Sequence, residues 1–304
     1  MATDYHRFLF VFVDGIGLVP AAPSNPLSET PSAELFALLG GPLTIEQTQS
    51  AEGVLLKPID ATLGVDGLPQ SATGQTALLT GVNAPLRLGR HITGFPGPRL
   101  RKIVEESSIL LHASRRGHSS TFANAYTEQY LRRLEDGSVR RSVTTCAVQA
   151  AAVPFRTLAD LERGRAVTWD IEGDLAADRA GVPIERVDSV VAGRRLAKLA
   201  NSHRLTLFET FLPDTVGHGR TALPAAEVVR RLDGLLGGIL GARRADTTVI
   251  LTSDHGNFED NRTRTHSRAP VPLLVVGPAA RHFSEVESIL EVTPELLGLL
   301  GPRV

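Results

Sequence analysis

The sequence is poor in cysteine and lacks long hydrophobic runs. Cys146 is the only cysteine of 304 residues, so the chain cannot form an internal disulfide, which is typical of a reducing compartment. The N-terminus shows no basic leader followed by an apolar core. No stretch approaches the roughly 20 apolar residues of a membrane-spanning helix. We therefore expect a cytoplasmic protein with no membrane partner.

Aromatic residues and an excess of one charge are also missing. Phe, Trp and Tyr make up 5% of the chain and the formal net charge is −1, which argues against a nucleic-acid partner. Lysine occurs three times against 29 arginines. Most arginines should lie on solvated surface, but their forked guanidinium suits phosphate, so a few are candidates for function. We expect a small-molecule substrate as the partner, and the sequence leaves the oligomeric state open.

What the sequence does contain is an alternation of short apolar runs with helical patterns. This alternation predicts an α/β fold, a three-layer sandwich in which a mostly parallel sheet lies between helices. The expected parallel strands are Arg7–Val13, Val54–Ile59, Ser119–Ala123, Leu205–Leu212, Thr247–Thr252 and Val271–Val276. The expected helices are Ser32–Leu39, Arg99–Arg116, Arg186–Asn201, Ala225–Arg243 and Ser284–Leu300.

One segment does not follow this alternation. From about Tyr126 to Pro183 the periodicity is weak and the charge is high. We treat residues 1–304 as one domain that carries a small lid-like insertion at about 126–183, with long surface loops as the alternative. Trp169, the single tryptophan, lies in this segment and could belong to a lid, an interface or ordinary packing.

Acidic residues follow three of the predicted strands. Asp14 comes after the first run, Asp214 after Leu205–Leu212, and Asp254 after Thr247–Ser253. In open α/β sheets, ligands bind at the carboxyl edge of the strands. Helix capping is the alternative for any one such aspartate, but three of them, two with histidines in reach, predict a metal site.

The histidines have spacings that suit metal ligation. Asp214 and His218 are four residues apart, so one helical turn would place them on the same face. Asp254 and His255 are adjacent, and His266 precedes the last strand. Carboxylate and imidazole without thiolate suit zinc or manganese, and magnesium remains possible.

A glycine-containing loop supplies a candidate nucleophile. Residues 67–76 read as a tight loop that opens a short helix, where free N–H groups favour a phosphate. A serine bound to a metal loses its proton more readily, so Ser71 could attack a phosphoester; the alternative is that Ser71 or Thr73 caps the helix. The loop is not a P-loop, because Gly74 is followed by Gln75 rather than lysine.

These motifs, in this order along the chain, resemble the alkaline phosphatase superfamily. The closer similarity is to its metalloenzyme branch, with cofactor-independent phosphoglycerate mutase and phosphopentomutase. The matching motifs are Asp14-Gly-Ile-Gly, Gln70-Ser71-Ala-Thr-Gly, Asp214-Thr-Val-Gly-His218-Gly, Asp254-His255-Gly-Asn and His266 before Pro-Val-Pro.

The resemblance implies two divalent metal ions and a phosphoserine intermediate on Ser71. One ion would be held by Asp214, His218 and His266. The second ion would be held by Asp14, Ser71, Asp254 and His255.

The chain also departs from the mutase pattern. Gln70 and Ala72 flank the nucleophile where the mutase has asparagine and glutamate, the large mutase cap is much reduced, and its arginine-rich substrate motif is missing. Five residues near the nucleophile are candidates for binding substrate: Gln70, Thr73, Arg87, Arg90 and His91.

Hydrolysis of a small phosphomonoester is the leading prediction for the activity. A phosphomutase that acts on a sugar phosphate or phosphoglycerate is the first alternative, because it needs a lid that excludes water. Hydrolysis of phosphodiesters or phosphonates at the same site is another. A homologue that binds metal but catalyses no reaction is the alternative of a different class.

Overall fold

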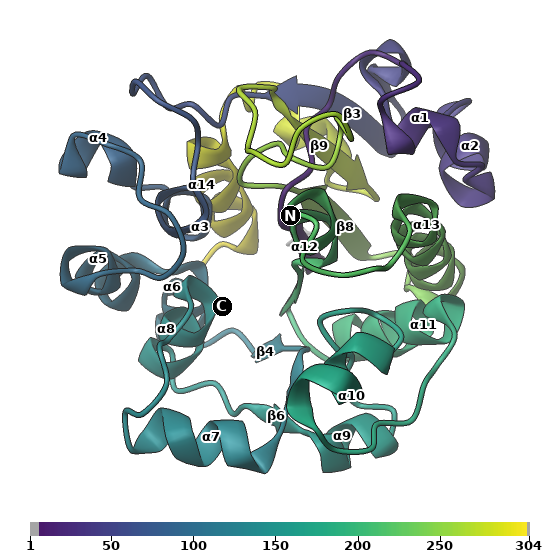
Figure 1. The fold of residues 1–304 in the computed structure, drawn as a ribbon. Coiled ribbons are helices and arrows are strands. Elements are labelled where there is room, and N and C mark those ends of the chain that lie inside the picture. Colours follow the sequence, from purple (N-terminus) through teal and green to yellow (C-terminus); the bar gives the residue numbers. More distant parts are fainter. Residues whose placement is uncertain (1–5, 303–304) are drawn as a thin grey trace.

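A seven-stranded sheet forms the centre of the protein in a computed structural model, which describes residues 6–302 (Figure 1). The strand order is β2-β3-β9-β8-β1-β7-β4. Strands β8, β1, β7 and β4 run parallel to one another, as predicted. The strands are β1 (Arg7–Val13), β2 (Gln49–Ala51), β3 (Val54–Ile59), β4 (Ser120–Phe122), β7 (Leu205–Thr210), β8 (Thr247–Thr252) and β9 (Val271–Val276).

Two of the predicted parallel strands are antiparallel to their neighbours. β9 pairs antiparallel with both β8 and β3, and β3 pairs antiparallel with β2. The sheet is therefore mostly but not wholly parallel. A buried apolar run of six residues looks the same in either direction, so its composition could not reveal the orientation.

Two hydrophobic layers cover the two faces of the sheet. Alternate residues of β1 point to opposite sides: Phe8, Phe10 and Phe12 to one layer, Leu9, Val11 and Val13 to the other. The first layer is completed by α3 (Ser71–Thr80), α5 (Pro98–Ser107), α6 (Ile109–Arg115), α8 (Val143–Ala150) and α14 (Ile289–Leu300). The second is completed by α1 (Pro26–Glu29), α2 (Ala33–Leu39), α11 (Ser189–Ala200) and α13 (Ala225–Ala242), on the opposite side of the sheet in Figure 1.

Smaller elements complete the chain. They are α4 (Ala84–Leu88), α7 (Glu128–Glu135), α9 (Leu158–Glu162), α10 (Asp174–Ala180), α12 (Leu212–Gly217), the two-stranded sheet of β5 (Ala125–Tyr126) and β6 (Arg156–Thr157), and two 3₁₀ turns, η1 (Ile45–Gln47) and η2 (Ala280–Phe283). No helix of residues 6–302 is long and apolar enough to cross a membrane.

Three predicted helices begin or break where a polar side chain intervenes. The pattern Arg99–Arg116 divides into two helices at Ser108, whose backbone is extended. The pattern Ser284–Leu300 starts only at Ile289, because Ser288 forms a capping box with Glu291. Similarly, α11 starts at Ser189, after Asp188 accepts a hydrogen bond from Val190 N–H.

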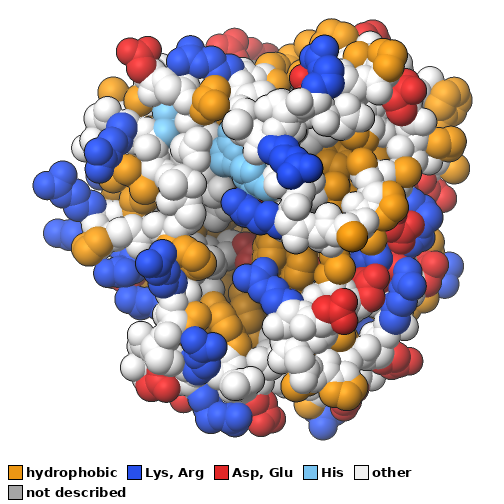
Figure 2. Space-filling model, viewed as in Figure 1, with side chains coloured by type: hydrophobic (Ala, Val, Ile, Leu, Met, Phe, Trp, Pro, Cys, Tyr) orange, Lys and Arg blue, Asp and Glu red, His pale blue; other side chains and the backbone are white. Residues whose placement is uncertain are grey.

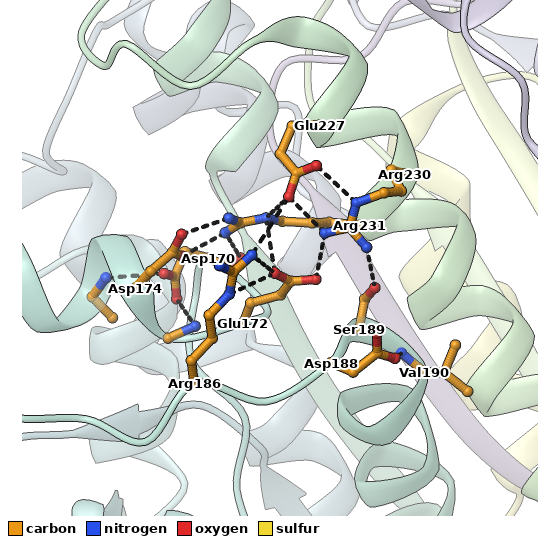
Figure 3. Close-up of polar contacts among 12 residues, drawn as sticks. Asp170, Glu172, Asp174, Arg186, Asp188, Ser189, Val190, Glu227, Arg230 and Arg231 are labelled. Carbon is orange, nitrogen blue, oxygen red and sulfur yellow. Dashed lines mark hydrogen bonds and ion pairs between the residues drawn. The ribbon is translucent and has the colours of Figure 1, made fainter.

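The segment that lacked periodicity is held to the main body in two ways. Its helix α8 lies in the core and packs against α3, α5 and α6. Its later part is tied to α13 by a network of ion pairs around the Arg231 side chain, which is 1% exposed (Figure 3). Arg231 contacts both oxygens of Asp174 at 2.6 and 2.7 Å and lies 3.2 Å from Glu227.

The same network neutralises one buried acid, Glu172. The Glu172 side chain is 2% exposed and lies 2.7 Å from Arg230 and 2.6 Å from Arg186 (Figure 3). Trp169, just before this cluster, stacks on Phe211 with ring centroids 4.2 Å apart and planes 5° from parallel. The network thus fixes Trp169 against the residue that precedes α12.

We expect Arg231→Leu to lower the free energy of unfolding by about 3–5 kcal/mol, because it removes the buried guanidinium group that pairs with Glu172, Asp174 and Glu227. Urea denaturation followed by circular dichroism measures the change. Arg132→Leu is the control, since Arg132 forms only an exposed pair with Glu128, worth about 0–1 kcal/mol. Equal effects of the two substitutions would contradict a stabilising role for the network.

The network also predicts an acid-dependent loss of stability. Hydrogen bonds from Arg230, and then from Arg231, lower the pKa of Glu227 from 4.5 to about 2. A carboxyl whose pKa is lowered by folding stabilises the protein above pH 4.5, and this contribution is lost as the pH falls towards about 2. We expect Arg230→Gln to reduce this pH dependence, measured from urea midpoints across that range, whereas Arg194→Gln on the exposed side of α11 leaves it unchanged.

Candidate metal centre

The seven residues predicted to bind metal gather at the carboxyl edge of the parallel strands. Asp14 directly follows β1, and Asp254 and His255 follow β8 after Ser253. Asp214 differs from the prediction: β7 ends at Thr210, and Asp214 lies in the first turn of α12. The strand ends earlier than its apolar pattern because Leu212 and Pro213 already belong to the helix.

The first cluster joins α12 to the loop before β9. His218, at the C-terminal end of α12, places its Nε2 3.2 Å from Asp214 Oδ1, as the four-residue spacing predicted. His266 Nε2 lies 3.6 Å from the same Asp214 oxygen and 3.0 Å from His218 Nε2. One carboxylate and two imidazoles therefore converge on one point.

The hydrogen bonds behind these rings show that the point suits a cation. His218 Nδ1 lies 2.8 Å from the Arg264 carbonyl oxygen, and His266 Nδ1 lies 2.8 Å from the Pro69 carbonyl oxygen. A carbonyl can only accept, so each Nδ1 donates and each neutral ring presents a lone pair at Nε2. Burial, and then His255, lower the pKa of His266 to about 4, which favours its neutral form. Two facing lone pairs repel each other unless a cation lies between them.

The second cluster surrounds His255, which is fully buried. Its Nε2 lies 3.2 Å from Asp14 Oδ1, 3.6 Å from Asp254 Oδ2 and 3.0 Å from Ser71 Oγ. The ring also stacks on His266 with centroids 3.7 Å apart, so the two clusters adjoin. Ligand atoms of Asp14, Asp254 and His255 lie within 4.8 Å of one another, as do those of Asp214, His255 and His266.

Burial makes the charged form of the acids in this site unfavourable. Asp254 is 0% exposed, and neither of its carboxylate oxygens has a hydrogen-bond partner. Burial, and then the Asp14 charge, raise the pKa of both Asp254 and Asp214. Burial alone would lower the pKa of His255, but the neighbouring Asp254 and Asp14 raise it to about 10. A buried carboxylate without a partner fits a divalent metal ion, which would supply the missing positive charge.

Ser71 is the first residue of α3, with Gln70 at the N-cap position. Its hydroxyl faces His255 and makes no capping bond, so the alternative role of helix cap does not apply. Gly74, one turn along, allows the helix to sit directly on Asp254, since a Cβ at Gly74 would lie 2.8 Å from the Asp254 carbonyl oxygen. The glycine of the Ser71 motif is therefore required for this close approach.

Three supporting residues were not predicted from the sequence as part of the site. Gln75 Nε2 donates to Asp14 Oδ2 at 3.0 Å, and Asn257 Nδ2 donates to Asp214 Oδ1 at 2.8 Å. Glu259 accepts from the backbone N–H groups of Gly17 and Asn257 at 2.8 and 2.7 Å. Asn257 lies within a quoted motif and Gln75 directly follows another, so their positions beside the ligands were the available signal.

Glu209 is a further acid that the sequence analysis did not single out. It lies near the end of β7, opposite Phe12 of β1, and accepts a hydrogen bond from Thr144 Oγ1 at 2.5 Å. Burial, the largest cause, raises the pKa of Glu209 to about 7, and the Asp14 charge acts in the same direction. A glutamate within an otherwise apolar strand pattern was the signal that marked it.

The five candidate substrate-binding residues divide into two groups. Gln70 adjoins Ser71, but the Thr73 hydroxyl is engaged with the backbone: it donates to the Gln70 carbonyl and accepts from Ile92 N–H at 3.1 Å each. Arg87 and Arg90 are exposed, in and just after α4, and His91 Nε2 lies 3.3 Å from the Val65 carbonyl. Binding of substrate by these residues remains a prediction.

Comparison with known proteins finds a metalloenzyme family and a set of mutase relatives. The model of the Metalloenzyme superfamily matches residues 185–302. The 2,3-bisphosphoglycerate-independent phosphoglycerate mutase of Aliivibrio fischeri is 34% identical over 99 residues, which cover 30% of this chain and 19% of that protein. The corresponding mutase of Desulforudis audaxviator is 31% identical over 166 residues, 47% of this chain and 33% of that protein. The match thus spans a third or less of these curated relatives.

Solved structures show the same fold over nearly the whole chain. The alkaline phosphatase of the Antarctic bacterium TAB5 superposes with a TM-score of 0.55 at 14% identity, covering 98% of this chain and 99% of that one. The PH0037 protein of Pyrococcus horikoshii gives a TM-score of 0.60 at 13% identity, covering 99% and 98%. Taken with the family-model match and the mutase relatives, these matches support a metalloenzyme of the alkaline phosphatase superfamily.

Proposed function

We propose that this protein hydrolyses a small phosphomonoester through a phosphoserine intermediate on Ser71, with two divalent metal ions at the sheet edge. The observation that carries the proposal is the position of Ser71 Oγ, 3.0 Å from His255 Nε2 at the junction of the two clusters. Asp214, His218 and His266 would hold one ion, and Asp14, Asp254, His255 and Ser71 the other. The curated relatives are named as phosphoglycerate mutases.

The residues divide the work of phosphoryl transfer among them. Ser71 Oγ forms a bond to phosphorus while the ester oxygen leaves with a proton as the alcohol; water then breaks the serine–phosphate bond and releases inorganic phosphate. Divalent ions in the two clusters would lower the pKa of the attacking hydroxyl and offset the charge of the transferred group. Ser71 is also the first residue of α3, and the N–H groups at the start of a helix favour phosphate oxygens.

Access to water favours hydrolysis over phosphate transfer within one substrate. The His218 side chain is 18% exposed, and histidine side chains are visible in the hollow at the centre of the face in Figure 2. A mutase must retain its intermediate behind a closed lid, whereas a hydrolase admits water. A phosphomutase is therefore the second candidate. It is supported by the names of the curated relatives.

We expect added metal to reverse the effect of Asp254→Asn on the melting temperature. In metal-free protein, Asp254→Asn should raise the melting temperature or leave it unchanged, because it removes a buried carboxylate whose oxygens accept no hydrogen bond. With zinc, manganese or magnesium added, wild type should become more stable than this variant. Differential scanning fluorimetry tests the reversal, with exposed Asp178→Asn as the control.

Metal content measures the number of ions directly. Elemental analysis of dialysed, loaded protein should give two ions for each wild-type chain and one for His218→Ala, which loses a ligand of the first cluster only. A single ion in wild type, or loss of all metal in His218→Ala, would overturn the two-ion assignment.

Phosphate release should depend on Ser71 and on metal together. We expect Ser71→Ala to reduce hydrolysis of an aryl phosphate and of sugar phosphates by at least about 1,000-fold, because the nucleophile is removed. Ser202→Ala, an exposed serine at the end of α11, is the control. Rapid acid quench and mass spectrometry should detect one phosphoryl group on the peptide that contains Ser71.

The products separate the candidate functions. Release of inorganic phosphate supports the hydrolase, whereas an isomerised sugar phosphate without release assigns a mutase. Turnover of a phosphodiester or phosphonate alone would reassign the substrate class. Two bound ions without turnover of any substrate would leave a metal-binding protein and contradict the proposal.

A further inference from the structure

An open pocket of about 740 Å³ lies away from the metal centre, between the start of α5 and the segment that links α7 to α8. It is lined by Phe95, Gly97, Arg101, Leu134, Arg140 and Arg141, among others. The motifs at the sheet edge do not include any of these residues. The pocket therefore needs an explanation of its own.

Arginine determines the chemistry of the pocket. Arg101 comes from α5, and Arg140 and Arg141 come from the turn before α8, so two separate segments bring three guanidinium groups to one hollow. Glu135 is the one acid among the lining residues. Only three lysines and 29 arginines are spread over a chain whose net charge is −1, so this concentration of positive charge is local.

The arginines retain donors for a ligand. Arg141 Nη1 makes one hydrogen bond, to Gln149 Oε1 at 3.3 Å, and lies 3.9 Å from Glu105, which is a loose ion pair. The Arg140 guanidinium lies 5.8 Å from the centre of the Phe95 ring, a position that orients it without using its hydrogen-bond donors. Planar forks of this kind match phosphate and carboxylate oxygens.

The pocket is also partly apolar. Phe95 is 46% exposed, one of the most exposed large hydrophobic side chains among the described residues, and Pro96 and Val139 line the same hollow. On the left of Figure 2, at the position that α5 has in Figure 1, lysine and arginine side chains gather around orange hydrophobic ones. A ligand that joins an anionic group to a hydrocarbon or ring body fits this combination.

The chain connects the pocket to the loop of Ser71. Ile92 exchanges hydrogen bonds with Thr73, two residues after Ser71: its N–H reaches the Thr73 hydroxyl at 3.1 Å, and its carbonyl accepts from the Thr73 N–H. Gly97 follows five residues later, so even a fully extended chain keeps it within about 18 Å of Ile92. In addition, α5 and α8 pack against α3, whose first residue is Ser71.

We propose that this pocket binds a phosphate- or carboxylate-bearing anion at a site distinct from the metal centre. The anion is either a distal group of the substrate or a separate small molecule; the recognition chemistry is the same. The inference goes beyond the proposed hydrolysis, because Arg101 and Arg140 can bind an anion whether or not Ser71 reacts.

Pyrophosphate is the probe for the first experiment, in metal-loaded Ser71→Ala protein so that no turnover occurs. Isothermal titration calorimetry should show two binding events, one at the metal centre and one at the pocket. Adding Arg101→Gln and Arg140→Gln should lower the affinity of the pocket for pyrophosphate at least about 10-fold, since each removes a charge-assisted hydrogen bond. Arg281→Gln, an exposed arginine of η2, removes the same charge elsewhere and should keep both events.

A second measurement identifies the source of the anion. The Arg101→Gln/Arg140→Gln variant is now made with Ser71 intact, and its Michaelis constants are compared with those of wild type. One phosphomonoester carries a second phosphate or carboxylate, and the other does not. A rise confined to the first substrate assigns the pocket to the substrate. Unchanged constants, together with lost pyrophosphate binding, assign it to a separate anion.

The proposal is overturned if the double substitution binds pyrophosphate like Arg281→Gln. That result is distinguishable from failure of the proposed function. Absence of phosphate release would count against Ser71 chemistry alone, because pyrophosphate binding at the pocket is measured without turnover.

Discussion

Burial of several carboxylates is the constraint on which this structure depends, and the molecule meets it in two different ways. Around Arg231, the buried Glu172 and the partly exposed Asp174 contact guanidinium groups at 2.6–2.7 Å. At the sheet edge, the hydrogen-bond partners of Asp14 and Asp214 are amide groups, Arg220 lies 3.8 Å from Asp214, and neither oxygen of Asp254 accepts a hydrogen bond. The charge of the acids around Arg231 is thus balanced within the protein, whereas balancing the charge of the acids at the sheet edge would take added cations.

The geometry of the fold explains why these acids meet. Parallel strands β1 and β8 are neighbours, so the residues that follow them emerge side by side, and α12 brings Asp214 in from β7 on the other side of β1. Glycines then allow close contact: a Cβ at Gly15 would lie 2.8 Å from Asp214 Cβ, and Gly15 has a φ of +83°. A compact metal centre therefore requires small residues beside its ligands as much as the ligands themselves.

The sequence predicted the bounds of several strands better than it predicted strand direction or the residues that support the site. The four strands Arg7–Val13, Val54–Ile59, Thr247–Thr252 and Val271–Val276 were predicted with the bounds observed, since their apolar runs are bordered by polar or turn residues. The antiparallel direction of β9 is a tertiary property that a uniform apolar run does not encode. Gln75 and Glu209 were missed for a related reason: hydrogen bonds to Asp14 or Thr144 bring together residues 61 and 65 positions apart.

The arrangement of residues 126–183 bears on which reaction the site can support. Helix α8 belongs to the hydrophobic core beside α3 and α5, so it cannot move without exposing buried side chains. Helix α10 is bound to α13 through Asp174 and Arg231, and Trp169 is stacked on Phe211. In the predicted lid, α7 and α9 are the helices to which neither of these two contacts belongs. Closing this segment over Ser71 would have to break these contacts, which agrees with the proposed hydrolysis rather than with retention of the intermediate.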